Sequence, residues 1–286
     1  MTPPYRLSLP LVATFILTGT AFAQAVPGPG VKPTTIPVPH RATYKIDLAH
    51  VAPNAGVTGA SGEMVYEVKG SSCAGFTTTQ RLVVQIGRSE QDDRKLDFQA
   101  TSFEPGNGAT YRFSSRTLVD DQPTDSLKGF AEKTPDGLSI ELEEPEAKQI
   151  NVSDKVIFPG QHLQSIVDAA KAGQKFFSTH TYEGSGTGTA PDTASAVIGA
   201  SRVGQDDDMT KGLRFWPVSV AYFDHDKAKT TDDKTKLPGE QTPSYQTSFK
   251  LYENGVSKDL ILDYGDYSLS GKLEKLEALP PAACNH

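Results

Sequence analysis

Polar and apolar residues alternate over most of the chain, in short stretches separated by turns rich in glycine or proline. Alternation with a period of two is typical of a strand with one face on a core and the other in water. Its regular recurrence predicts an all-β fold. We expect strands at residues 43–48, 63–68, 76–86, 96–100, 110–114, 127–133, 138–142, 175–182, 196–202, 215–223, 247–252, 256–264 and 267–276.

Short turns between these stretches predict hairpins. Residues 104–108 and 135–137 each join two predicted strands, and Asn254-Gly255 is the strongest short hairpin signal in the chain. The glycine-rich residues 54–62 are interpreted as a loop, and so are residues 184–189. The latter lack the Lys-Ser/Thr pair of a phosphate-binding loop.

One segment has a helical period and predicts the main helix, at residues 161–172. Pro159-Gly160 precedes it, and Gly173 can take the left-handed position that closes a helix. Two roles fit this helix: it covers the open face of a sheet or the mouth of a barrel, or it is a connector packed on a sheet edge. Its apolar stripe consists of Leu163, Ile166, Val167 and Ala170.

The amino-terminal sequence predicts export. Residues 1–23 have the features of a secretory signal: the positive charge of Arg6, a short apolar run, and small residues before a cut near Ala23. Residues 24–39 are rich in proline and predict a disordered leader. We expect residues 40–286 to form a single soluble domain without a membrane span.

Charge narrows the choice of partner. The net charge is −7, which disfavours nucleic acid as a partner. Residues 224–239 are charged and without periodicity, so we interpret them as a mobile excursion.

The chain has two cysteines, Cys73 and Cys284. An oxidising compartment favours a disulfide between them, which would tie an early strand to the tail and make one closed unit. Two free, buried thiols are the alternative.

Candidate chemistry is sparse, and we predict no catalytic residues, no metal site and no cofactor. The six histidines have no zinc-binding spacing. Asp224-His225-Asp226 and Asp206-Asp207-Asp208 are interpreted as solvated charge rather than cation sites. Glu141 and Glu143 alternate with Leu142, which indicates a solvent-facing row rather than a pair of glycosidase acids.

An aromatic group on one predicted strand, Phe215, Trp216, Tyr222 and Phe223, fits either core packing or the wall of a lipid or sugar groove. Pro217 interrupts this group and predicts that the strand lies at an edge or is bulged.

The sequence Lys69-Gly70-Ser71-Ser72-Cys73-Ala74-Gly75-Phe76, followed by Thr77-Thr78-Thr79-Gln80-Arg81 and a cysteine near the end, resembles the EipB family of cell-envelope integrity proteins. The motif is Cys73, Gly75 and the aromatic Phe76, where the family usually has Trp. The resemblance implies a periplasmic β-spiral of about fourteen strands, related to the half-barrels of LolA and LolB. It also implies a Cys73–Cys284 disulfide and no assigned catalytic residue.

Two functions follow from this resemblance. The first is a non-enzymatic periplasmic protein, expected to be a monomer, that maintains outer-membrane integrity through a protein or lipid partner. The second is a carrier of acyl chains or lipoproteins of the LolA/LolB type. An open, apolar cavity of a few hundred cubic ångströms would favour a carrier, and a filled interior would favour a scaffold.

Overall fold

The computed structural model describes residues 37–53, 55–89, 92–205, 209–224 and 242–284. The predicted signal peptide, most of the leader, Asp206 to Asp208 and most of the charged stretch 224–239 lie outside these ranges. The secondary-structure elements of the described residues, in chain order, are β1 His40–Val51, β2 Val57–Ser71, β3 Gly75–Arg88, β4 Arg94–Glu104, β5 Thr110–Val119, β6 Gln122–Thr134, β7 Gly137–Glu144, β8 Lys148–Val152, α1 Pro159–Lys171, β9 Phe176–Thr181, β10 Asp192–Ile198, β11 Arg202–Val203, β12 Arg214–Asp224, β13 Tyr245–Tyr252, β14 Ser257–Asp263 and β15 Tyr267–Ala278.

All the strands belong to one antiparallel sheet. Its order is β8-β7-β6-β5-β4-β3-β2-β1-β15-β14-β13-β12-β10-β9, and β11 pairs with β12 beside this path. The path has two ends, β8 and β9, so the described sheet is open rather than closed into a barrel. The all-β fold class with one helix is confirmed, and the sheet has fifteen strands where about fourteen are expected.

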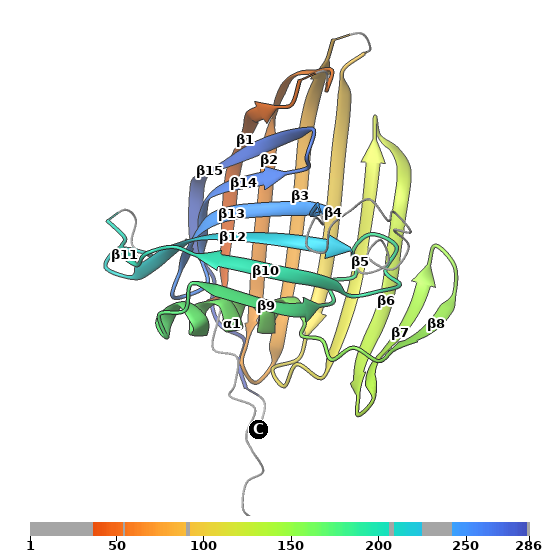
Figure 1. Cartoon of the computed structure of the whole chain (residues 1–286), viewed down its shortest axis with the longest axis vertical. Helices are drawn as coiled ribbons and strands as arrows, with labels where there is room; N and C mark the ends of the chain where they lie inside the picture. The colour runs from red at the N-terminus through yellow and green to blue at the C-terminus, as the bar shows by residue number, and fades with distance from the viewer. Residues whose placement is uncertain (1–36, 54, 90–91, 206–208, 225–241, 285–286) are drawn as a thin grey trace, which may run out of the picture. The chain divides into compact units, whose positions relative to one another are not determined.

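The sheet has two halves, β1–β8 and β9–β15, joined where β1 pairs with β15. Figure 1 shows β9 to β14 crossing in front of the strands of the first half. The segment before α1 connects the two: Ile157 bridges Thr181 of β9, while Phe158 and Tyr182 are buried with side chains of β5, β6 and β7. The chain therefore passes from one end of the sheet to the other just before the helix begins.

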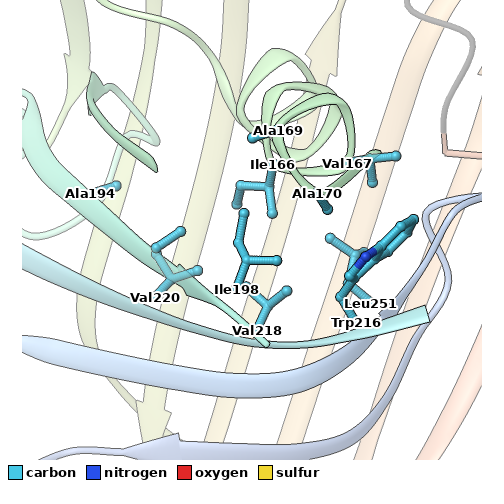
Figure 2. Packing of buried hydrophobic residues seen from close by; sticks show 11 residues of the cluster. Ile166, Val167, Ala169, Ala170, Ala194, Ile198, Trp216, Val218, Val220 and Leu251 are labelled. Atoms are coloured by element: carbon cyan, nitrogen blue, oxygen red, sulfur yellow. The ribbon is translucent and has the colours of Figure 1, made fainter. Parts of the chain in front are cut away.

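The helix covers the second half of the sheet. Four of its buried residues, Ile166, Val167, Ala169 and Ala170, belong to one core cluster (Figure 2). The sheet contributes Ala194, Ala196 and Ile198 of β10, Trp216, Val218 and Val220 of β12, and Leu251 of β13. Gly173 follows with a positive φ of 77°, which lets the chain turn away. The predicted helix is confirmed. Of the two roles expected for it, covering the face of a sheet agrees with these contacts.

Two expectations of local structure are wrong, and one strand of the structure was not expected. Residues 57–62 belong to β2 instead of a loop, because Gly62 permits close strand pairing: a Cβ there would lie 2.0 Å from the Val83 carbonyl oxygen. Strand β8 has no counterpart in the predicted strands. Strand β12 is neither at an edge nor bulged, since β10 and β13 flank it and pair with it without a register shift. Pro217 lies where β10 has ended, and its carbonyl accepts the Gly199 N–H.

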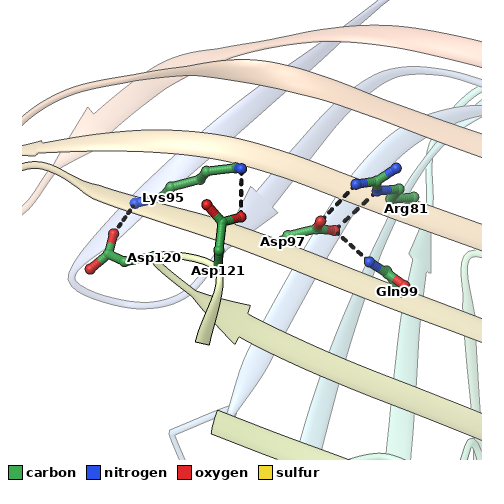
Figure 3. Close-up of polar contacts among 6 residues, drawn as sticks. All are labelled: Arg81, Lys95, Asp97, Gln99, Asp120 and Asp121. Carbon is green, nitrogen blue, oxygen red and sulfur yellow. Dashed lines mark hydrogen bonds and ion pairs between the residues drawn. The ribbon is translucent and has the colours of Figure 1, made fainter. Parts of the chain in front are cut away.

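The outer surface of β3 and β4 carries matched charges. Arg81 makes a two-pronged contact with Asp97, at 3.1 and 2.7 Å, and Gln99 donates to the same carboxylate (Figure 3). Lys95 pairs with Asp121 in the same region. Acidic side chains on this surface therefore have basic partners on the neighbouring strand or turn.

Candidate functional site

A cavity of about 530 Å³ lies between the two halves of the sheet. Strands β1 to β6 form one side, and β12 to β14 with α1 form the other. Its volume falls within the range of about 300–1,000 Å³ that is typical of small-molecule sites. Aromatic side chains dominate its wall: Tyr44, Tyr66, Phe76, Phe98, Tyr111, Phe113, Tyr222, Tyr245 and Phe249.

Strand alternation decides which side chains reach the cavity. Along β3, Phe76, Thr78 and Gln80 line the cavity. Thr79, which lies between Thr78 and Gln80, and Arg81, which follows Gln80, are exposed. This is the two-residue period seen in the sequence, with one face turned to the cavity and the other to solvent.

The turn between β2 and β3 carries the Cys73-Gly75-Phe76 motif at one end of the cavity. Gly75 has a φ of +83°, and a Cβ there would lie 2.8 Å from the Glu104 carbonyl oxygen. A side chain at this position would therefore clash with the end of β4. Phe76 pairs with Glu104 across the sheet and places its ring in the cavity wall.

Cys73 and Cys284 are joined by a disulfide in the structure, with Cα atoms 5.6 Å apart. The tail is also attached through its backbone, because the Ala282 N–H donates to the Gly70 carbonyl and Leu279 N–H to that of Pro39. The last residues of the predicted leader are held here too, through a bond from the Val38 N–H to the Asn254 carbonyl. The disulfide fixes the tail against the motif turn at this end of the cavity.

Glu104 connects the motif turn to the helix. Its carboxylate accepts the Gly160 N–H at 2.8 Å, in the first turn of α1, where the helix dipole favours negative charge. Burial raises the pKa of Glu104, while this hydrogen bond and nearby Lys133 oppose the shift. Burial lowers the pKa of Lys133, and its attraction to Glu104 opposes that shift. Glu104 therefore has a structural role at the helix start.

The cavity meets solvent between the first half of the sheet and the glycine-rich loop that follows β9. The exposed lining residues on the cavity face of the strands and in this loop are Asp125 of β6, Ser185 and Gly186. We call these three residues the mouth. The loop at residues 184–189, interpreted from sequence as a flexible turn, thus contributes to the cavity entrance.

The remaining sequence candidates are distributed over core and surface. Trp216 and Phe215 are buried in core clusters, whereas Tyr222 of the same strand lines the cavity. Glu141 and Glu143 are exposed on β7, as expected of a solvent-facing row. Within the described ranges, no group of three or more His, Cys, Asp or Glu side chains is arranged to hold a metal ion.

The search for a membrane-spanning helix, made over the same described ranges, finds none that is sufficiently long and apolar.

Fold and cavity together define a class: an open, all-antiparallel β-sheet protein with an interior chamber of ligand size. The chain belongs to the EipB-like family, which matches residues 33–280. It is 36% identical, over 246 residues, to the cell envelope integrity protein EipB of Brucella abortus (strain 2308), and the match covers 84% of each chain.

A solved structure agrees with this assignment. The fold is similar to the crystal structure of a beta-barrel-like protein of the domain of unknown function DUF1849 from Brucella abortus, with a TM-score of 0.76 and 33% identity. The match covers 85% of this chain and 98% of that one.

Proposed function

We propose that this protein is an exported, periplasmic and non-enzymatic factor that supports cell-envelope integrity by binding the apolar part of a lipid in its cavity. Its similarity to a cell envelope integrity protein supports the role in the envelope. A signal-like first segment and the Cys73–Cys284 disulfide support an oxidising compartment outside the cytoplasm.

The single observation that carries the lipid as partner is the cavity itself. A scaffold acting only through its outer surface needs no interior space, and packed protein interiors hold few voids larger than a water molecule. Here about 530 Å³ is left open among aromatic and aliphatic side chains. An apolar ligand would gain about 25 cal/mol for each square ångström of surface removed from water.

A carrier role of the LolA/LolB type is the second candidate, and the mouth favours it. A carrier must exchange its cargo, and the three mouth residues border the cavity at exposed positions. A binder that holds its lipid permanently and a carrier that passes it on differ in the rate of lipid release, which stopped-flow transfer to acceptor vesicles measures.

The experiment uses two neighbouring threonines on opposite faces of β3. Thr78 lines the cavity and Thr79 is exposed, so Thr78→Trp fills the cavity while Thr79→Trp adds the same ring outside. We expect wild type and Thr79→Trp to bind the neutral apolar dye N-phenyl-1-naphthylamine and Thr78→Trp to lose binding. In a strain lacking the gene, Thr79→Trp should restore growth on deoxycholate and Thr78→Trp should not.

Circular dichroism and melting curves establish that both variants are folded. Equal dye binding by the two variants would contradict the cavity as the binding site. Equal restoration of growth would contradict its role in envelope integrity.

A further inference from the structure

The charges inside the cavity indicate which charge the polar end of its ligand carries. Three carboxylates line it, from Glu104, Asp125 and Glu183, and no Lys or Arg is among its described lining residues. An anionic head group would meet these carboxylates there without a Lys or Arg to compensate them, which disfavours its binding. The outer surface of the same strands is different, since Arg81 and Lys95 pair with aspartates there.

Of the three carboxylates, Glu183 is the one placed among aromatic rings of both halves of the sheet. Burial is the main cause of the raised pKa of Tyr66, Tyr111, Tyr222 and Tyr245, and the Glu183 carboxylate adds to each shift. These tyrosines come from β2, β5, β12 and β13, on opposite sides of the cavity that Glu183 also lines. The Tyr111 hydroxyl donates to the Glu183 backbone carbonyl at 3.2 Å.

The contacts of Glu183 leave room for a cation. The Glu183 carboxylate, which adds to the raised pKa of Tyr222, has about four acceptor positions. The nearest basic group, Nδ1 of His162, lies 3.9 Å from Oε1, beyond hydrogen-bonding distance. The Glu183 side chain is 29% exposed, so a ligand entering the cavity can reach it.

Aromatic rings complete a cation-binding environment. The ring centre of Tyr222 lies 6.0 Å from that of Tyr245 and 6.3 Å from that of His162. The face of an aromatic ring attracts an ammonium group, and a carboxylate supplies the opposite charge. Glu104 is less available, because the α1 terminus and Lys133 already compensate it.

We propose that Glu183 is the counter-ion for an ammonium group, so that the cavity selects amphiphiles with an apolar body and a cationic or amine-bearing head. This inference rests on the proposed function, because it names the ligand class of the same cavity. The source we favour is a membrane lipid with an amine in its head group, which such a cavity would distinguish from an anionic lipid.

The test compares three amphiphiles of equal chain length: decyltrimethylammonium, decyl sulfate and decyl glucoside. Calorimetric titration below their critical micelle concentrations gives the affinity of the full mature chain for each. We expect the ammonium compound to bind tightest and the sulfate weakest. Glu183→Gln should weaken ammonium binding by about tenfold, the scale of one charge-assisted contact, and should not weaken binding of the glucoside.

Glu141→Gln is the matched control. It removes the same single charge from an exposed position on β7, so any general attraction of this acidic chain for cations falls equally in both variants. Ammonium binding should be unchanged in this control.

Equal binding of sulfate and ammonium by the wild type would overturn the proposal, and so would equal ammonium affinity in the two variants. The wild-type order of affinities decides the question even if Glu183→Gln does not fold. Absence of binding for all three amphiphiles would instead refute the cavity as a lipid site.

Discussion

The two faces of β3 and β4 show opposite treatments of charge. On the outer face, Asp97 has 8% of its side chain exposed and is held by Arg81. Inside the cavity, Glu183 lies in the loop after β9, and the Tyr111 hydroxyl of β5 donates to its backbone carbonyl. Isolated ion pairs at protein surfaces contribute little stability. The partly exposed Glu183, in contrast, has no Lys or Arg beside it among the described residues that line the cavity, an arrangement that suits ligand recognition.

The inner face also divides into a filled part and an open part. Under α1, the side chains of Ile166, Val167 and Trp216 interlock in a sealed cluster (Figure 2). Next to it, Leu163 and Ile166 of the same helix border the cavity. One helix therefore seals one part of the sheet and forms a wall for the other.

The largest expected effect concerns the filled interior. Phe158 is fully buried, with its ring centre 5.3 Å from that of Tyr111. Phe158→Ala should lower the free energy of unfolding by about 3–5 kcal/mol, measured by urea denaturation. Phe176→Ala is the outer control: Phe176 is 60% exposed, and we expect a change within about 0.5 kcal/mol. Equal losses would contradict the assignment of inner and outer faces.

The disulfide is expected to have the next largest effect. Cys73→Ser removes a link between residues 211 positions apart, and loss of such a link from the folded chain typically costs about 2–4 kcal/mol. The melting temperature should fall accordingly, and the unreduced wild type should show no reactive thiol under denaturing conditions. Two labelled thiols per wild-type chain would contradict the link.

A smaller effect is expected at the outer ion pairs. Arg81→Gln should cost about 1 kcal/mol, because it leaves the shielded Asp97 without its basic partner. Arg94 pairs with the more exposed Asp120, and Arg94→Gln should cost less than Arg81→Gln. Urea denaturation of both variants measures the difference; a larger loss for Arg94→Gln would reverse the argument.

The Arg81 pair should also depend on pH. The hydrogen bond from Arg81 is the main cause of the lowered pKa of Asp97. A lowered folded-state pKa stabilises the protein above the unfolded value, about 3.9, and the gain disappears as the pH falls through the folded value. The stability gap between wild type and Arg81→Gln should therefore be constant near neutral pH and shrink below about pH 4. A gap that persists at lower pH would exclude ionised Asp97 as its cause.

Local periodicity accounts for the part of the fold that sequence could predict. Alternation at residues 138–142 identified β7, and the stripe from Leu163 to Ala170 identified α1. The wrong predictions lie where strand pairing matters more than local composition. Gly62 suggests a loop by its composition, but the absence of a side chain allows β2 to lie close to Val83 of β3. The five residues of β8 are too few, and too polar at Lys148 and Gln149, to give a clear alternation.

The cavity could not be predicted in this way. Its walls combine Tyr44 with Tyr222 and Tyr245, which meet only because the two halves of the sheet cross. Glu183 stands between a strand and a glycine-rich loop, with no motif to mark it. The motif Cys73-Gly75-Phe76 was detectable, but its place at one end of the cavity follows only from the contact of Gly75 with Glu104.

The most direct test of the central claim is native mass spectrometry of the protein released from the periplasm without detergent, comparing wild type with Thr78→Trp. We expect a wild-type population carrying a lipid with an amine-bearing head group, and a Thr78→Trp population without it. Bare protein in both samples, or the same bound mass in both, would contradict a lipid site in this cavity.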